Sequence, residues 1–274
     1  MIMRRLRSIL ATIVITLAII LACIYWIAPV ALSFYAARKV PPVARVIPTD
    51  LKDHSVSQAT GMKLSYFGYE FEVPWSDLDE TKTTLYPKDK VEKTRVVLAF
   101  RSGLRLMVTA VPARELVNFV ATEFKIQPQG FEILFGPGTS ASDYTFVRNV
   151  YGFTPDKMHY WSLSSRLHAR ETMVLVTKSI MPVKAAGSGI FNLENQYYRG
   201  FQQGDPRVSR DGVVVDLYSD EGHFEMALLK KDYTNPAGVT QPEINRIVQS
   251  LRKATPGEVA ISASTEIEST PRFR

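Results

Sequence analysis

The first feature of the hydrophobic pattern is a long apolar stretch near the N-terminus. Residues 8–37 carry no charge, and residues 9–28 are almost entirely Ile, Leu, Val and Ala. About 20 apolar residues in a helix span the ~30 Å hydrocarbon core of a bilayer, whereas a signal peptide has an apolar region of only about 7–15 residues. The pattern predicts a transmembrane helix and interfacial extension over residues 8–35; a cleaved signal and a buried core helix are the alternatives.

Charges at the two ends of this stretch predict its orientation. Three arginines lie within residues 1–7, whereas Arg38 is the first basic residue after the stretch. Positive charges close to a span favour its cytoplasmic end, and Tyr25 and Trp26 near the other end are typical interfacial aromatics. We therefore expect a single-pass signal-anchor with a cytoplasmic basic segment at residues 1–7 and the rest of the chain outside the cytoplasm. The inverted topology is the alternative.

The single cysteine, Cys23, lies inside the apolar stretch. Residues 20–22 before it roughly match a lipoprotein cleavage box, but residues 24–27 continue the apolar run where a lipidated cysteine is followed by a polar tether. We interpret Cys23 as a small apolar side chain facing lipid. The rest of the chain therefore has no disulfide, thiolate nucleophile or zinc thiolate.

Alternation of apolar and polar residues predicts two β-hairpins after the apolar stretch. Residues 64–66 and 69–73 form the first. In the second, residues 96–100 and 104–108 flank a turn where Gly103 can adopt the left-handed conformation. Both hairpins present one apolar face, as strands of an antiparallel sheet do.

Helical spacing replaces this alternation in the middle of the chain. A helix is expected over residues 113–124, a second after the capping pair Ser140 and Asp143, and a short third one over residues 154–161. Residues 164–181 predict a longer helix, although its second half is apolar all round and could be a strand.

Strands return near the C-terminus and are followed by one more helix. Residues 213–217 and 224–228 alternate around residues 219–222, which predict a type I turn with a glycine bulge. Thr240 and Glu243 form a capping box for the last helix.

This order of elements predicts an α+β fold, with an N-terminal transmembrane helix followed by one domain with an antiparallel sheet and a helical layer. Each β block is too small to stand alone, so the two are expected to share one sheet or sandwich. Proline-containing residues 36–60 are predicted to be a tether, residues 61–253 the α+β domain, and the Ser-, Thr- and Glu-rich residues 254–274 a disordered tail.

Two segments resemble the ends of PsbP-like domains. One is the strand Tyr69-Glu70-Phe71-Glu72-Val73-Pro74, and the other is the end of the last helix, Gln249-Ser250-Leu251-Arg252. PsbP-like domains are small α/β/α sandwiches with assembly and accessory roles. The resemblance implies such a sandwich, leaves out the helical stretch 113–181, and transfers no functional residue.

The distribution of the net charge along the chain changes which partners are expected. The chain has 33 Lys and Arg against 27 Asp and Glu, a net charge of +6, and residues 1–49 hold six basic and no acidic residues. Residues 50–274 are therefore neutral and lack the basic surface of a nucleic-acid-binding protein. We expect the lipid bilayer as a partner of residues 8–35, an unidentified protein or envelope component as a second partner, and no nucleic acid.

Candidate chemistry is sparse, and no residue is predicted to be catalytic, cofactor-binding or metal-binding. His168 and Glu171 have the spacing of a di-iron ligand pair, but such sites use two pairs and two further glutamates; we interpret them as a polar helix face. Asp77, Asp79 and Glu80 lack the glycine and twelfth-position glutamate of an EF-hand loop, and are interpreted as a surface turn.

Glycine loops and aromatic clusters also favour structural interpretations. Residues 135–140 lack the lysine of a phosphate loop, and residues 187–189 follow a helix instead of opening one. The aromatic residues within 151–161 and 197–201 are expected in the core, although rings exposed together would indicate a binding surface.

Two functional hypotheses follow. The first is a membrane-anchored accessory or binding domain without catalytic activity. The second is a membrane-tethered extracytoplasmic enzyme whose site assembles only in the fold. A deep polar pocket that joins His159 or His168 to a carboxylate would favour the enzyme, and a shallow aromatic surface would favour binding.

Overall fold

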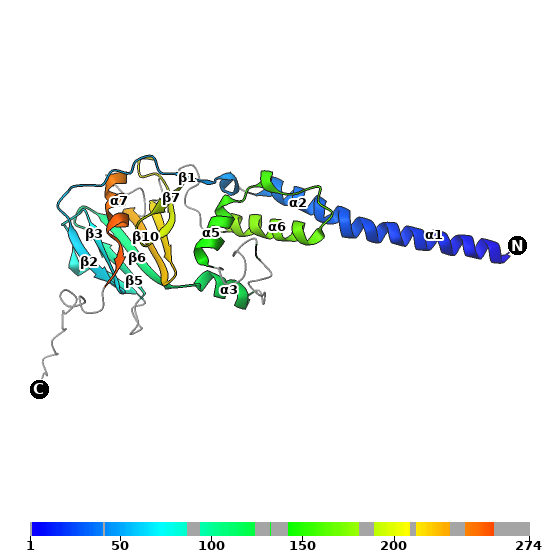
Figure 1. Ribbon diagram of the computed structural model, residues 1–274, viewed down its shortest axis with the longest axis horizontal. Helices are drawn as coiled ribbons and strands as arrows, with labels where there is room; N and C mark the ends of the chain where they lie inside the picture. The colour runs from blue at the N-terminus through cyan, green and yellow to red at the C-terminus, as the bar shows by residue number, and fades with distance from the viewer. Residues whose placement is uncertain are drawn as a thin grey trace, which may run out of the picture.

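The computed structural model describes residues 2–40, 42–86, 94–123, 132, 142–180, 189–208, 212–230 and 239–254. The molecule is elongated, with an N-terminal helix at one end, a β-rich domain at the other, and several helices between them (Figure 1). Residues 255–274 of the predicted tail, and the predicted glycine loops at 135–140 and 187–188, lie outside the described residues.

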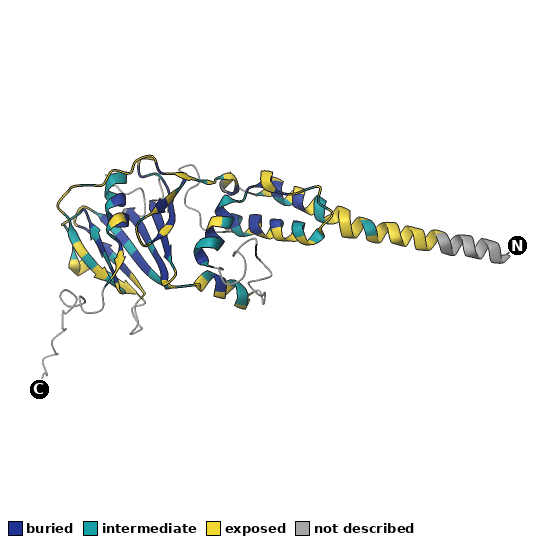
Figure 2. Ribbon diagram, in the orientation of Figure 1, coloured by how far each residue is buried: buried dark blue, intermediate teal, exposed yellow. Residues whose placement is uncertain are grey.

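The N-terminal end is one continuous helical rod. It consists of α1 (Ile2–Ala22), a π-helical turn (Cys23–Ile27) and α2 (Ala28–Lys39). The segment Thr12–Lys39 is long and apolar enough to cross a membrane, and its most apolar part has no buried residue. Figure 2 shows this exposure in yellow along the rod. Apolar side chains without protein contacts are typical of a helix that faces lipid.

Eleven described strands form two sheets, which together with α7 (Gln241–Ser250) we call the sheet domain. The larger sheet has the order β1-β7-β8-β9-β10-β6-β5-β4, and the smaller has the order β11-β3-β2. β1 pairs with β7 in parallel, and the other pairs between these strands are antiparallel. The strands are β1 (Pro48–Asp50), β2 (Met62–Tyr66), β3 (Tyr69–Val73), β4 (Thr84–Tyr86), β5 (Arg95–Ala99), β6 (Leu104–Pro112), β7 (Ile190–Glu194), β8 (Arg199–Gln203), β9 (Val213–Ser219), β10 (Gly222–Lys230) and β11 (Arg252–Lys253).

The main core is apolar and lies between the two sheets and α7. β3 contributes Phe71, β10 contributes Phe224, and α7 contributes Ile247. The ring centroids of Phe71 and Phe224 are 5.5 Å apart and the ring planes meet at 62°, an edge-to-face arrangement that is favourable for aromatic pairs. The α+β fold with an antiparallel sheet is thus confirmed.

A group of helices packs on the other face of the larger sheet near β7, β8 and β9 and extends away from it toward the N-terminal rod (Figure 1). They are α3 (Glu115–Glu123), α5 (Asp143–Gly152), a short 3-10 turn (Pro155–Lys157) and α6 (Ser165–Ile180). With α2 they form what we call the helical arm (Figure 1). Phe146, Val150 and Tyr151 of α5 pack against Phe201 of β8 and Tyr218 of β9. Every residue of β9 from Val213 to Tyr218 is therefore buried, because both faces of this strand are covered.

Several local predictions are confirmed. The two N-terminal hairpins and the hairpin β9–β10 form as expected, and Gly103 has a φ of +92° in its turn. The capping box holds the start of α7, where the backbone N–H of Thr240 donates to the Glu243 carboxylate at 2.7 Å. Residues 173–176 belong to α6, so the alternative of a strand there is wrong.

Other local predictions are corrected. The N-cap of α5 is Ser142, whose Oγ accepts from the backbone N–H of Thr145, and not Ser140. The turn at residues 219–222 has no glycine bulge, since Ser219 pairs directly with Gly222 and Gly222 lacks a positive φ. Glycine fits there for another reason: a Cβ would lie 2.7 Å from the hydroxyl of Tyr69, which would have to shift.

The predicted tether, residues 36–60, is packed against the rest of the chain along much of its length. β1, which lies within it, extends the larger sheet through β7. Farther on, the side-chain amide of Asn245 in α7 donates to the carbonyl oxygens of Asp53 and Ser55, each at 2.8 Å. These contacts differ from the expectation of a free tether, because they fix the segment to the sheet domain.

Candidate functional site

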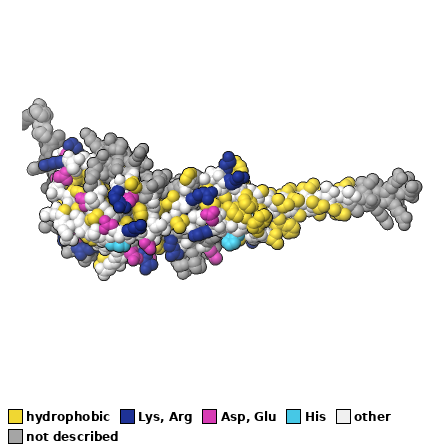
Figure 3. All heavy atoms as spheres, turned by 90° about the horizontal axis from the view of Figure 1, so that it is seen from above, with side chains coloured by type: hydrophobic (Ala, Val, Ile, Leu, Met, Phe, Trp, Pro, Cys, Tyr) yellow, Lys and Arg dark blue, Asp and Glu magenta, His cyan; other side chains and the backbone are white. Residues whose placement is uncertain are grey.

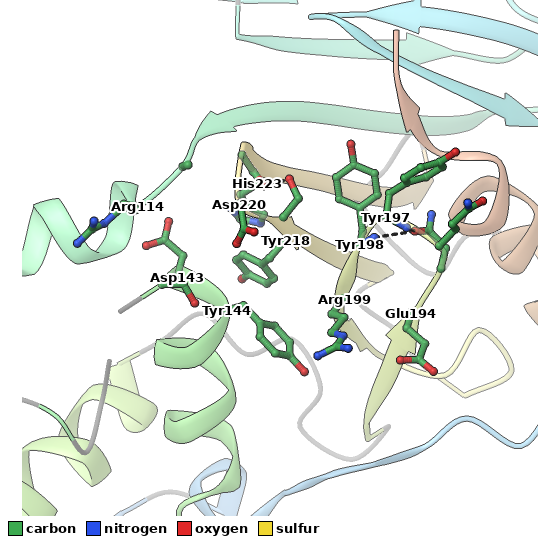
Figure 4. Close-up of a pocket in the computed structure, with 16 residues that line it drawn as sticks. Arg114, Asp143, Tyr144, Glu194, Tyr197, Tyr198, Arg199, Tyr218, Asp220 and His223 are labelled. Atoms are coloured by element: carbon green, nitrogen blue, oxygen red, sulfur yellow. Dashed lines mark hydrogen bonds between the residues drawn. The ribbon is translucent and has the colours of Figure 1, made fainter. Parts of the chain in front are cut away.

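A pocket of about 650 Å³ opens where the sheet domain meets the helical arm (Figure 4). It is formed by the β7–β8 loop, the β9–β10 turn and the start of α5. A hollow of about 920 Å³ adjoins it, and Tyr144, Glu194 and Arg199 line both. Principal side chains around the pocket are Asp143, Tyr144, Tyr197, Arg199, Tyr218 and His223.

Tyrosine rings form much of the pocket wall. Tyr144 from α5 stacks on Phe201 with ring centroids 5.7 Å apart, and the guanidinium of Arg148 lies 5.7 Å from its ring centroid. Tyr197 is 57% exposed, next to the buried Tyr198. Tyrosine combines a large apolar surface with a hydroxyl, a combination enriched at binding surfaces.

A buried polar network lies beneath this wall. The Gln203 amide donates to the Tyr151 hydroxyl at 2.9 Å and to Asp216 at 3.0 Å. His223 Nε2 lies 3.3 Å from the other Asp216 oxygen, and its ring stacks on Tyr218 at 4.3 Å. Burial, together with the negative charge of Asp216, raises the pKa of the phenols of Tyr151 and Tyr218. Both therefore stay protonated as neutral hydroxyls, and the network holds the sheet to the arm.

Asp143 joins two helices at the edge of the pocket. Its Oδ1 accepts from the backbone N–H of Val117 at 3.1 Å, so it caps α3 from the neighbouring helix α5. Such a cap is needed because Arg114, which precedes α3 with a φ of +62°, has no side-chain oxygen to offer. The second oxygen, Oδ2, is buried without a hydrogen-bond partner among the described residues. The sequence pattern identified Asp143 as part of a cap but assigned it to the wrong helix.

The candidate pair His168 and Glu171 does not act as a pair. Glu171 accepts from the backbone N–H and ring Nδ1 of His159, at 2.9 and 2.5 Å, so both its oxygens are used in holding the loop before α6. The ring nitrogens of His168 face the carbonyl oxygens of Ser164 and Tyr160, at 2.8 and 3.1 Å. Both His168 and Glu171 are buried, so the predicted solvated helix face is wrong.

The acidic cluster at residues 77–80 forms hydrogen bonds with its own turn and with the turn between β5 and β6. Asp77 accepts from the backbone N–H of Ser102 at 2.7 Å. Lys82 and Thr81 donate to Asp79, and these hydrogen bonds lower the pKa of its carboxyl to about 2. The structure agrees with the interpretation of this cluster as a surface turn.

The aromatic clusters divide between core and surface. Tyr151, Tyr198 and Phe201 are buried, as expected for core residues. Trp161 is not, since 85% of it is exposed. It lies in the loop before α6 and not in a helix, which contradicts the predicted helix over residues 154–161 beyond its first turn.

Sequence reasoning missed the network of Gln203, Asp216 and His223. The available signal was Asp216 within the apolar strand 213–217, because a carboxylate on a strand whose two faces are covered requires a partner. Its partners come from β8 and β10, so only the strand pairing identifies them.

No protein-family model, curated protein or solved structure matches this chain. The resemblance to PsbP-like domains therefore stays a prediction, and the fold and pocket have to be interpreted from their own geometry.

Proposed function

We propose that the protein is a single-pass membrane-anchored binding domain, without catalytic activity, that holds the sheet domain outside the cytoplasm and binds a protein or envelope component there. The observation that carries this proposal is the rod Thr12–Lys39, whose apolar side chains are exposed while the rest of the chain buries an ordinary core. Exposed apolar surface on this scale is stable in lipid and unstable in water.

The pocket between sheet domain and arm supports binding more than chemistry. Its wall is rich in tyrosine, and Tyr197 and Arg199 are exposed beside it. Its titratable groups have structural contacts: Asp216 and His223 contact each other beneath the wall, and Asp143 caps α3 through one of its two oxygens. Exposed tyrosine and arginine around a recess are typical of protein-binding surfaces.

The topology is tested by labelling single cysteines in intact cells. In a Cys23→Ala background, Val208→Cys places a thiol on an exposed turn of the sheet domain, and Ile2→Cys places one at the N-terminus. A membrane-impermeant maleimide should label position 208 and leave position 2 unlabelled until the cells are permeabilised. Labelling of position 2 alone would show the inverted topology and contradict the proposal.

Binding is tested by photo-cross-linking in cells from a probe at Tyr197, with a probe at Val208 as the matched control. The same cross-linked species should form from position 197 and not from 208, and Arg199→Glu should abolish it. Turnover of a small molecule by the purified protein, with no cross-link specific to position 197, would contradict a binding function and favour an enzyme.

A further inference from the structure

The tip of the helical arm exposes apolar side chains to an unusual degree. We call the loop Tyr160–Ser164, just before α6, the arm tip. Its Trp161 and Leu163 are 85% and 79% exposed, the highest fractions among the large apolar side chains of the described residues. In water this arrangement is unfavourable, and it therefore indicates a surface that is covered in the protein's working state.

The arm tip lies beside the end of the apolar rod. Ser165 and His168 at the start of α6 line one groove together with Ile24 and Ala28 of the rod. Farther along, Thr172 Oγ1 is 3.4 Å from Ser33 Oγ, and Leu175 packs with Ala37. α6 therefore runs parallel to α2, and its first turn is level with residues 24–28.

The rod would leave the hydrocarbon core of the bilayer near residues 24–28. About 20 residues cover the ~30 Å core, so a span that begins after Arg7 ends near Ile27. Phe34, in the next turns of α2, stacks on Tyr160 at 4.2 Å and lies 5.9 Å from Trp161. These rings are then in the interfacial layer, where tryptophan and tyrosine are enriched.

Positive charge on the arm also fits a position near the membrane surface. The part of the arm nearest the rod, segments 28–45 and 153–180, contains seven Lys or Arg and two Asp or Glu, and one residue of each sign, Lys178 and Glu171, is buried. Arg166 and Arg170 are exposed on the first turns of α6, and basic side chains gather on the arm next to the apolar rod (Figure 3). Basic residues near a bilayer are attracted to the phosphate groups of anionic lipids.

We propose that the arm tip is a second membrane contact, in which Trp161 and Leu163 enter the interfacial layer of the bilayer that the rod crosses, while Arg166 and Arg170 face its phosphates. The partner is thus an anionic phospholipid surface. This inference rests on the proposed membrane anchor. It goes beyond that anchor because a second contact fixes the tilt of the arm, and through it the distance of the pocket from the membrane.

The experiment measures the depth of a fluorophore at the arm tip. The full chain with Cys23→Ala and Leu163→Cys is labelled with NBD and reconstituted in vesicles of phosphatidylcholine and phosphatidylglycerol. Val208→Cys, which is 61% exposed in the sheet domain, is the matched control. Quenching by lipids with a nitroxide near the headgroup should be several-fold stronger at position 163 than at 208, with blue-shifted emission.

The outcomes separate this inference from the proposed function. Vesicle flotation of the chain, combined with equal, weak quenching at both positions, overturns the arm-tip contact and leaves the anchor intact. Failure of the chain to float with vesicles overturns both. Burial of the position-163 probe without lipid quenching, together with a cross-linked dimer, would show that a second copy covers the tip and would also overturn the proposal.

Discussion

The sheet domain and the helical arm differ in the composition of their innermost contacts and in the side chains that they expose. Between the two sheets and α7 the core consists of apolar residues such as Phe71, Phe224 and Ile247. The arm instead buries Ser33, His168, Glu171 and Lys178 between its helices, and exposes Trp161 and Leu163 at its tip. Each region also buries side chains of the other kind, such as Val150 in the arm and Asp216 in the sheet domain. What distinguishes the arm is the pair of exposed apolar side chains at its tip, which the proposed membrane contact would cover.

The largest expected effect comes from the apolar core. Phe224 is fully buried and contacts the rings of Tyr69 and Phe71. Because a cavity forms, Phe224→Ala should lower the free energy of unfolding of the sheet domain by about 3–5 kcal/mol. Urea unfolding measures this loss when it is followed by the fluorescence of Trp75 in a background with Trp26→Phe and Trp161→Phe, because these two tryptophans lie outside the sheet domain. A matched Phe34→Ala change in the arm should leave this transition unchanged, and an equal loss in both variants would contradict the separation of the two regions.

A smaller effect is expected at Lys178, which ties α6 to the end of α5. Its ammonium group donates to the carbonyl oxygens of Tyr151 and Phe153, each at 2.8 Å. Lys178→Met leaves these buried acceptors without a donor and should destabilise the arm by about 1–3 kcal/mol. Amide hydrogen exchange in α5 and α6 measures the loss, and unchanged exchange would contradict the assigned role.

Lys178 also gives the arm a pH dependence of defined sign. Burial lowers its pKa from 10.5 to about 8. Between pH 8 and about 10 the unfolded chain holds this proton and the folded chain does not, so the contribution to stability rises with pH. The rise should appear as a difference between the native protein and Lys178→Met, since both share the tyrosines that titrate at higher pH. A difference that falls with pH would contradict the assignment.

The smallest effect is expected where the arm meets the sheet domain. Asp143→Ala removes the cap of α3 and should cost about 1 kcal/mol, whereas Asp143→Asn keeps an oxygen for the Val117 N–H and should cost less. Exchange of the Val117 amide reports both changes. Equal losses for the two variants would show that the charge of Asp143, and not its hydrogen bond, is the important feature.

Periodicity predicts the sheet domain well, because the alternation of apolar and polar residues along a strand shows which of its faces is turned toward the core. The alternation at residues 69–73 and the capping box of Thr240 and Glu243 are local signals, and both appear in the structure. β1 carried no such signal, since three residues, Pro48–Asp50, join the sheet only through a partner more than 100 positions away.

The arm was predicted as helices but not as a packed unit. Helical spacing identifies the apolar face of α6, but it cannot show that α2 covers its polar face. His168 is buried beside α2, and Glu171 is buried where it accepts hydrogen bonds from His159. Likewise, the pocket forms from segments around residues 143, 197 and 223, which no short sequence motif connects.

The most direct test of the proposed membrane contact compares hydrogen exchange in the helical arm and the sheet domain of the full chain embedded in lipid nanodiscs. The double change Trp161→Ser and Leu163→Ser should speed exchange in the first turns of α6, residues 165–172, and leave β9 unchanged, because the proposed contact with the bilayer involves the arm tip and not the sheet domain. Val208→Ser serves as the control and should alter neither region. Unchanged exchange in α6, or an equal change in β9, would contradict the proposal that the arm tip contacts the membrane.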